Sequence, residues 1–158
     1  MKKYFALLIV VLLLSIGYFF SLRVAMPKEN VSGYFAIFNT IIDQSYYDSF
    51  KYIAADPDDF PEEDHLKFSF LMKNYCRKND CKFLFMSYSE LEEEGYIVDG
   101  GFSQGILFGF DYLTIDEESM VGRAYFYKGN LSSYRREFSA TLENKKWVVT
   151  LTNQITVS

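Results

Sequence analysis

The feature that most constrains this chain is an uncharged apolar run near its start. Residues 4–22 read YFALLIVVLLLSIGYFFSL, nineteen residues without a charged side chain. At 1.5 Å per residue, a helix of this length spans about 28 Å, close to the hydrocarbon thickness of a bilayer. A surface helix of a soluble domain would show a polar face, and this run has none. We therefore expect residues 4–22 to cross a lipid membrane as one helix.

The residues around the apolar run predict its orientation. Lys2 and Lys3 precede it and Arg23 ends it, and a short tail before a long C-terminal part is typical of a signal anchor. The alternative is a cleaved signal peptide, but the small residues Ser15 and Gly17 lie inside the run. The prediction is an uncleaved anchor with three parts: a cytoplasmic tail and transmembrane helix at 1–23, a linker at 24–32, and a domain outside the cytoplasm, periplasmic or at the cell surface, at 33–158.

The domain that follows is acidic and rich in aromatic residues. The whole chain has 21 acidic and 16 basic side chains, and 49% of its residues are hydrophobic. A chain of this composition and length can bury one packed core. A nucleic-acid surface needs clustered Lys and Arg, whereas the basic pairs here are short and have acidic residues close in sequence. We expect no nucleic-acid partner.

Two amphipathic helices are predicted at the start of the domain. Apolar residues recur at three- and four-residue steps from Gly33 to near Ala54, which predicts the first helix. Pro61 opens the second, which we expect to stop near Tyr75. One side of this second helix carries Leu66, Phe70 and Lys73. A broad apolar side is formed by Phe68, Leu71, Met72 and Tyr75.

The rest of the domain has the pattern of a sheet. Residues 82–86 (KFLFM) predict a short buried strand, and a brief helix capped by Ser87 or Ser89 follows, ending at Gly95. Short turns then separate four predicted strands, which are Ile106–Ile115, Ser119–Lys128, Tyr134–Leu142 and Lys146–Val157. The first of these four is apolar on both faces, so we expect both faces to be covered. The predicted fold class is α+β, with two N-terminal helices packed on a curved antiparallel sheet that ends in a four-stranded meander.

The cysteines bracket a predicted turn. Cys76 and Cys81 are separated by Arg-Lys-Asn-Asp, four good turn formers. A turn there brings the two Cβ atoms within disulfide range, and an exported domain can be oxidised. Free thiols and a metal or redox site are the alternatives, although zinc usually takes four ligands and redox pairs favour C-x-x-C. We predict a disulfide.

The last predicted hairpin resembles one known fold. Leu142–Val149 reads LENKKWVV, a polar turn followed by Lys-Trp and apolar residues, with Lys145 where many such hairpins have Gly. This segment and the order of elements over 30–158 are similar to the NTF2-like (cystatin-like) α+β family. The resemblance implies a curved sheet wrapped on a long helix, with a pocket or an interface at its open end. The short tail, membrane helix and external domain also look like components of type IV secretion systems.

Three titratable residues are candidates for a pocket or an ion pair. His65, the one histidine, is flanked by acidic residues, which is typical of an exposed side chain; NTF2-like enzymes often use a His or Asp as general base. Asp111 lies in the middle of the strand ILFGFDYLTI, where a carboxylate needs a partner. Arg123 on the neighbouring strand is the predicted partner. A structural ion pair is favoured over catalysis because such pairs are common.

The remaining features favour binding over chemistry. Tyr125, Tyr127 and Tyr134 form an aromatic group across two predicted strands, and exposed tyrosines favour protein contacts. The acidic run at 56–64 lacks EF-hand spacing, and no phosphate, dinucleotide or hydrolase motif occurs. We predict no metal or cofactor.

The predicted function is therefore a membrane-anchored binding or assembly domain without catalytic activity, with a protein partner, as in a cell-envelope or secretion complex. One alternative is a small-pocket enzyme or ligand carrier of the NTF2-like type, which a deep cavity holding Asp111 or His65 would favour. The other alternative is an immunity or inhibitor protein.

Overall fold

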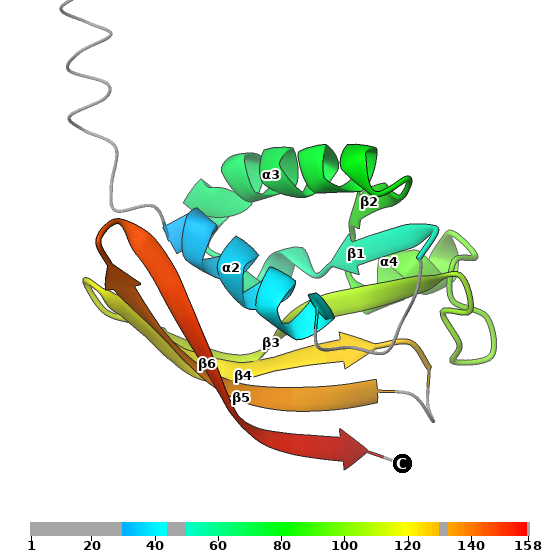
Figure 1. Ribbon diagram of the computed structural model, residues 1–158. Coiled ribbons are helices and arrows are strands. Elements are labelled where there is room, and N and C mark those ends of the chain that lie inside the picture. The colour runs from blue at the N-terminus through cyan, green and yellow to red at the C-terminus, as the bar shows by residue number, and fades with distance from the viewer. Residues whose placement is uncertain (1–29, 44–49, 130–132, 158) are drawn as a thin grey trace, which may run out of the picture.

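The computed structural model describes residues 30–43, 50–129 and 133–157. These residues form one mixed, curved sheet with helices on both faces (Figure 1). The strands follow the spatial order β2-β1-β3-β4-β5-β6. Their bounds are β1 Tyr52–Ala55, β2 Lys82–Phe85, β3 Gly105–Ile115, β4 Ser119–Tyr127, β5 Ser133–Glu143 and β6 Lys146–Val157. The helices are α2 (Asn30–Asp43), α3 (His65–Lys78) and α4 (Tyr88–Glu93), with the 3-10 turns η1 (Pro57–Asp59) and η2 (Glu62–Asp64) before α3.

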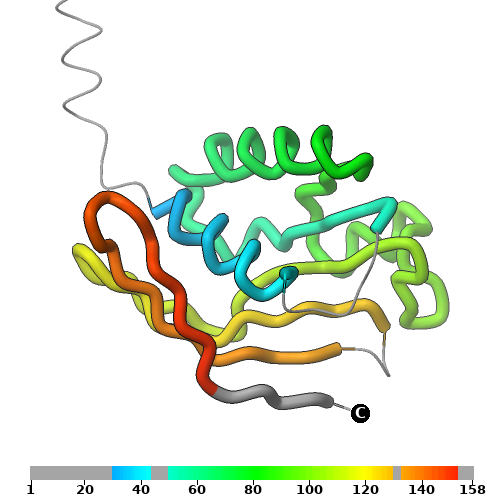
Figure 2. The backbone as a smooth tube through the Cα atoms, in the orientation of Figure 1, coloured from blue at the N-terminus to red at the C-terminus, as the bar shows by residue number. Residues whose placement is uncertain are grey.

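Helix α2 fills the concave side of the sheet. Its apolar residues recur at helical spacing, so Tyr34, Ile37, Phe38 and Ile41 share one face and are at most 1% exposed. Phe38 is central to this contact, because its ring lies 5.5 Å from that of Phe108 and 5.2 Å from that of Tyr75. Figures 1 and 2 show α3 as the outer layer above α2, and β5 and β6 curving below it.

A second, smaller core lies on the opposite face, over β1, β2 and the first half of β3. It is closed by α4 and the loop that follows α4, and its members are Ala54, Leu84, Leu91, Ile97, Phe102 and Leu107. Gly105–Phe110 are therefore all buried. The prediction that the first meander strand is covered on both faces is therefore confirmed for its first half only, since Asp111, Tyr112 and Thr114 in its second half are exposed.

The four-stranded meander is confirmed with boundaries within one residue of those predicted. The pairs β3–β4, β4–β5 and β5–β6 are antiparallel. Strand β2 and helix α4 are also confirmed. Ser87 caps α4 in a reciprocal capping box with Glu90, and Gly95 follows the helix with φ 76°.

The prediction of one helix from Gly33 to near Ala54 is wrong at both ends. Helix α2 begins at Asn30, so residues 30–32 of the predicted linker 24–32 are helical. Tyr52–Ala55 is a strand, β1, which pairs in parallel with β2 on one side and with β3 on the other. The helical spacing of apolar residues continues by coincidence to Phe50, whereas the run Tyr-Ile-Ala-Ala gains ladder hydrogen bonds on both edges and buries three residues. The sheet is consequently mixed, and the predicted fully antiparallel sheet is corrected.

The second helix also differs from its prediction at both ends. The chain after Pro61 first forms the 3-10 turn η2, and the α-helix begins at His65 and continues to Lys78, past Tyr75. The backbone N–H of Asn79 ends the helix by donating to the carbonyls of Tyr75 and Cys76.

The predicted membrane segment 4–22 lies outside the described residues, as do the proposed linker residues up to 29. Among the helices that the structure describes, none is both long and apolar enough to span a bilayer.

The contact between α2 and the sheet can be tested by truncating the same residue type at two sites. Phe38→Ala should lower the free energy of unfolding by about 3–5 kcal/mol, because it leaves a cavity in the main core. Phe70→Ala, on the exposed side of α3, is the matched control and should change it by less than about 0.5 kcal/mol. Denaturant titration of the full chain in detergent, followed by Trp147 fluorescence, measures both. Equal losses would show that α2 is not the centre of the core.

Candidate functional site

The outer sheet face, turned away from α2, carries the titratable side chains of the meander. It comprises Asp111, Tyr112, Val121, Arg123, Glu137 and Val148 on strands β3 to β6. Strand alternation places these residues opposite the buried Phe110, Ala124 and Phe138. In β3, the pairing with β4 shifts by one residue between Phe110 and Tyr112. The bulge allows the consecutive residues Asp111 and Tyr112 to reach partners on the same face.

Asp111 binds Arg135. The Nε of Arg135 donates to both carboxylate oxygens, at 2.9 and 3.2 Å, across the intervening strand β4. The predicted partner, Arg123, instead donates to Glu137 at 2.8 Å. The hydrogen bond with Glu137 raises the pKa of Arg123, and the charge of Asp111 adds a smaller contribution. The predicted pair is therefore corrected, because the bulge turns Asp111 toward β5.

Tyr112 on β3 is the second contact of the Arg123 side chain. The guanidinium of Arg123 lies over the Tyr112 ring, 5.5 Å from its centroid. Tyr112 is 47% exposed, and so are Val148, at 47%, and Val121, at 49%. Tyr112 therefore contacts the Arg123–Glu137 pair through Arg123, whereas Val121 and Val148 lie farther along the same face. No described helix covers this part of the face; α4 covers the part over β1, β2 and the start of β3.

Asp59 marks the border of the outer sheet face, and sequence reasoning missed it. Strand β1 ends at Ala55, opposite Phe108, so the backbone N–H of Phe110 has no strand partner on that side. Asp59 accepts a hydrogen bond from this N–H at 3.0 Å and another from the Tyr125 hydroxyl at 2.8 Å. A side chain at Gly109 would collide with the Asp59 carboxylate. Glycine is needed there for the close approach.

The Asp59 carboxylate is half-buried, and this burial changes its pKa. Desolvation raises its pKa, and the hydrogen bonds from Tyr125 and Phe110 oppose that increase. Desolvation also raises the pKa of Tyr125, with Asp59 as the next cause. The two groups therefore form a half-buried acid–phenol pair that fixes η1 against β3 and β4.

The structure does not bring His65 near Asp111. The Nε2 of His65 donates to the carbonyl oxygen of Phe60 at 2.8 Å, and its ring meets Phe85 edge-on with centroids 5.0 Å apart. Phe85 packs with the main core on the α2 side of the sheet, whereas Asp111 lies on the outer sheet face. His65 and Asp111 therefore belong to separate environments.

The three tyrosines predicted as an interface also do not share one surface. Tyr125 and Tyr127 point toward the second core, where the Tyr127 hydroxyl donates to the carbonyl of Gly100. Tyr134 lies on the α2 side and stacks on Phe126, with ring centroids 5.5 Å apart. Each is partly buried. The exposed aromatic residue of the meander is Tyr112, which the sequence analysis did not single out.

Cys76 and Cys81 lie together at the C-terminal end of α3. Both are free thiols, so the predicted disulfide is not formed in this structure. The backbone N–H of Cys81 donates to the carbonyl of Cys76 at 3.0 Å. Desolvation raises the pKa of Cys76, and a hydrogen bond between the two thiols adds to it. Desolvation raises the pKa of Cys81 as well. Reactive redox cysteines have lowered pKa values, so this environment favours a structural role for the pair.

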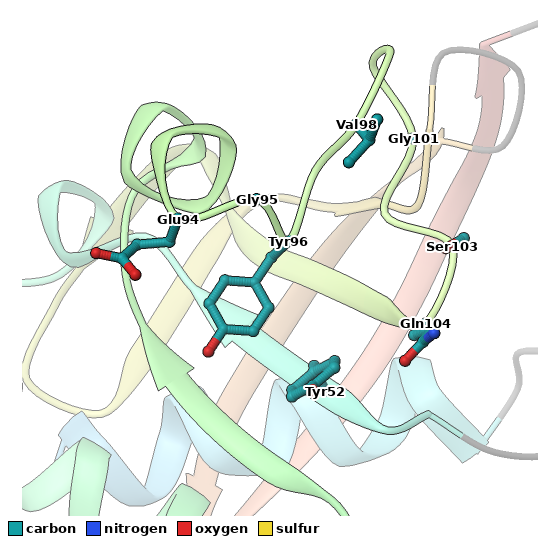
Figure 3. Close-up of a pocket in the computed structure, with 8 residues that line it drawn as sticks. All are labelled: Tyr52, Glu94, Gly95, Tyr96, Val98, Gly101, Ser103 and Gln104. Carbon is teal, nitrogen blue, oxygen red and sulfur yellow. The ribbon is translucent and has the colours of Figure 1, made fainter.

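A pocket of about 540 Å³ opens beside the start of β1 and the loop between α4 and β3 (Figure 3). Tyr52 and Tyr96 form its aromatic wall, with ring centroids 5.1 Å apart and planes at 69°. Its other lining residues are Glu94, Gly95, Val98, Gly101, Ser103 and Gln104. Neither Asp111 nor His65 lines it. Within residues 30–43, 50–129 and 133–157, no three His, Cys, Asp or Glu side chains cluster closely enough to hold a metal ion.

No family model, no curated protein and no solved structure matches this chain.

The buried carboxylate gives a pH-dependent prediction. Because the folded state raises the pKa of Asp59, its contribution to stability is complete below its ordinary value near 3.8 and is lost as the pH rises through the raised value. Asp59→Asn lacks this loss and keeps an oxygen that accepts both hydrogen bonds. We expect its free energy of unfolding, relative to the wild type, to increase from about pH 4 upward. Denaturant titrations at a series of pH values measure this difference.

Tyr125→Phe provides the second variant for this test. It removes a hydrogen bond that lowers the pKa of Asp59, so the pH-dependent loss of stability should move to higher pH. A constant difference between Asp59→Asn and the wild type at all pH values would contradict the raised pKa.

The cysteine pair gives a separate prediction. Oxidation should join Cys76 and Cys81 within one chain, making it lighter by two hydrogen atoms in mass spectrometry. The closed loop is short, so the disulfide should stabilise the domain by about 2 kcal/mol. The double variant Cys76→Ala with Cys81→Ala is the control and should not respond to reductant. Disulfides found only between chains would refute the predicted pairing.

Proposed function

We propose that this protein is a membrane-anchored binding or assembly domain without catalytic activity, held outside the cytoplasm by a single helix at residues 4–22. The outer sheet face is its binding surface, and a protein is the partner. The observation that carries this proposal is the set of half-exposed side chains Tyr112, Val121 and Val148 on the same sheet face as the Arg123–Glu137 pair.

The composition of this surface supports a protein partner. Exposed Tyr and Arg are enriched where protein interfaces concentrate their binding energy, and here the Arg123 guanidinium lies over the Tyr112 ring. The ion pair leaves the guanidinium oriented before any partner arrives, which reduces the entropy lost on binding. The β-branched Val121 and Val148 add apolar contact without flexible side chains.

The placement of the titratable groups also supports binding. Asp111, Arg123 and Arg135 are each engaged in ion pairs across strands, and His65 donates to a backbone carbonyl. The two ion pairs lie next to the register shifts of β3 and β5 and connect neighbouring parts of the sheet. The resemblance to NTF2-like domains, including those of secretion complexes, agrees with an assembly role.

The pocket beside Tyr52 favours a second candidate function, that of a carrier for a small polar ligand. Two tyrosine rings offer an apolar wall, and Gln104, Ser103 and Glu94 offer polar groups around the opening. This combination suits an uncharged molecule with both an apolar face and hydroxyl groups. Most residues that line this pocket are exposed, so a ligand there would stay largely in contact with water. We therefore favour the outer sheet face as the principal site.

The proposal can be tested by photocrosslinking in the membranes of the native cell. A photoreactive amino acid in place of Val121 should give one discrete protein adduct. Tyr112→Ala should reduce its yield at least about fivefold, as expected for a central interface residue. Val98, another exposed valine, is the matched control position and should give no such adduct. Equal adducts at Val98 and Val121, or none at Val121, would contradict the assigned surface.

The anchor and the absence of catalysis need separate measurements. The full chain should remain in the membrane after alkaline washing, and a reporter at its C-terminus should lie outside the cytoplasm. Release by alkali or a cytoplasmic reporter would refute the placement. Turnover of a substrate by the purified chain, abolished by Asp111→Asn or His65→Ala, would refute the non-catalytic role.

A further inference from the structure

Helix α3 exposes two large apolar side chains to solvent. Leu66 is 84% exposed and Phe70 is 66% exposed, the highest values among the large hydrophobic residues that the structure describes. They are four residues apart and therefore lie on the same side of the helix. The opposite side holds Phe68, Met72 and Cys76 in the main core. An exposed Leu–Phe pair on a well-packed helix needs an explanation beyond folding.

The same side of α3 is basic. The helix sequence HLKFSFLMKNYCRK contains four Lys or Arg and no acidic residue, whereas the chain as a whole carries a net charge of −5. At 100° per residue, Lys67 and Lys73 flank Leu66 and Phe70, and Arg77 lies in line with them. All three cations are exposed. We define Leu66, Lys67, Phe70, Lys73 and Arg77 as the exposed face of α3.

The exposed face of α3 begins next to the point where the domain joins its predicted anchor. The N-terminal half of α2 is joined to the residue before α3, because the Tyr34 hydroxyl donates to Asp64 at 3.0 Å. Figure 1 shows the two helix starts at the same end of the domain, with α3 outermost. Only residues 23–29 separate the predicted membrane helix from α2. Seven residues reach at most about 24 Å, so the domain cannot move far from the lipid surface.

We propose that the exposed face of α3 docks on the same bilayer that holds the anchor, on anionic headgroups. Leu66 and Phe70 enter the boundary between headgroups and acyl chains, while Lys67, Lys73 and Arg77 contact lipid phosphates. This inference rests on the membrane anchor of the proposed function. A short tether gives a high effective concentration, so this small surface suffices for docking.

Docking through α3 determines which way the domain faces. Helix α3 is the layer farthest from the outer sheet face, with α2 and the sheet between them (Figure 1). A domain seated on α3 therefore presents Tyr112, Val121 and Val148 away from the bilayer. The acidic turn η2, with Glu62 and Glu63, forms the limit of the basic surface on the N-terminal side.

The test uses the full chain in lipid nanodiscs with tryptophan as a depth probe. Phe70→Trp places a probe on α3, and Val121→Trp places a matched one on the outer sheet face; the wild type gives the background of Trp147. With brominated phosphatidylglycerol, Phe70→Trp should be quenched and shifted to shorter wavelength. Val121→Trp should show only the background. In neutral phosphatidylcholine discs the Phe70→Trp response should fall.

Charge variants in the Phe70→Trp chain test the role of the lysines. Lys67→Glu with Lys73→Glu should reduce the docking equilibrium at least about 25-fold, since each cation near an anionic surface contributes about a factor of five. The double variant Lys67→Arg with Lys73→Arg keeps both positive charges and should leave the docking equilibrium unchanged. Equal quenching in anionic and neutral discs would overturn the charge-dependent docking.

Two further outcomes separate this proposal from the proposed function. A chain that fails to copurify with the nanodiscs contradicts the anchor, and the docking falls with it. A retained chain in which Phe70→Trp is no more quenched than Val121→Trp overturns the docking alone. That second result would favour an acidic protein as the occupant of the exposed face of α3.

Discussion

The packing of α2 against the concave side of the sheet is the contact on which the rest of the structure depends. Tyr34, Ile37, Phe38 and Ile41 are almost fully buried in it. The long strands β3 to β6 curve around this helix, and their outer sheet face is left to solvent. Helix α3 packs on α2 and on β2, so α2 and the sheet separate the two exposed surfaces of the domain. The proposed lipid contact and the proposed protein contact thus lie on opposite sides of the main core.

Strong local patterns in the sequence predicted most of the elements. Alternation along β5 and β6, turn residues between them, and the Ser87 capping box each specify structure within a few residues. Strand β1 was missed because its four residues continue a helical spacing and because parallel neighbours come from distant segments, 82–85 and 105–108. Nothing local to Tyr52–Ala55 reveals a ladder on both edges.

The sequence predicts that Asp111 and Arg123 form ion pairs, but it does not predict which residues they pair with. A carboxylate inside an apolar strand required a cation, and both Asp111 and Arg123 are indeed in ion pairs. Which cation meets which carboxylate depends on the bulge after Phe110, and a bulge has no clear signal in ILFGFDYLTI. In the sequence, Asp59 is one of several acidic residues at 56–64, and nothing local distinguishes it from the others. Its contact with Tyr125 joins residues 66 positions apart, beyond the reach of any local pattern.

The early end of β1 has a consequence for the solubility of the protein. Strand β1 pairs with β3 only as far as Phe108, so the same edge of β3 has no strand neighbour after that residue. Unpaired backbone groups on such an edge can pair with a strand of another molecule, which is a common start of β-sheet aggregation. Asp59 occupies the first free N–H with a carboxylate, and the adjacent bulge distorts the remaining edge. The negative charge and the irregular backbone together make this edge of β3 unfavourable for pairing with a strand of another molecule. The acidic loop therefore disfavours edge-to-edge association between copies of this domain.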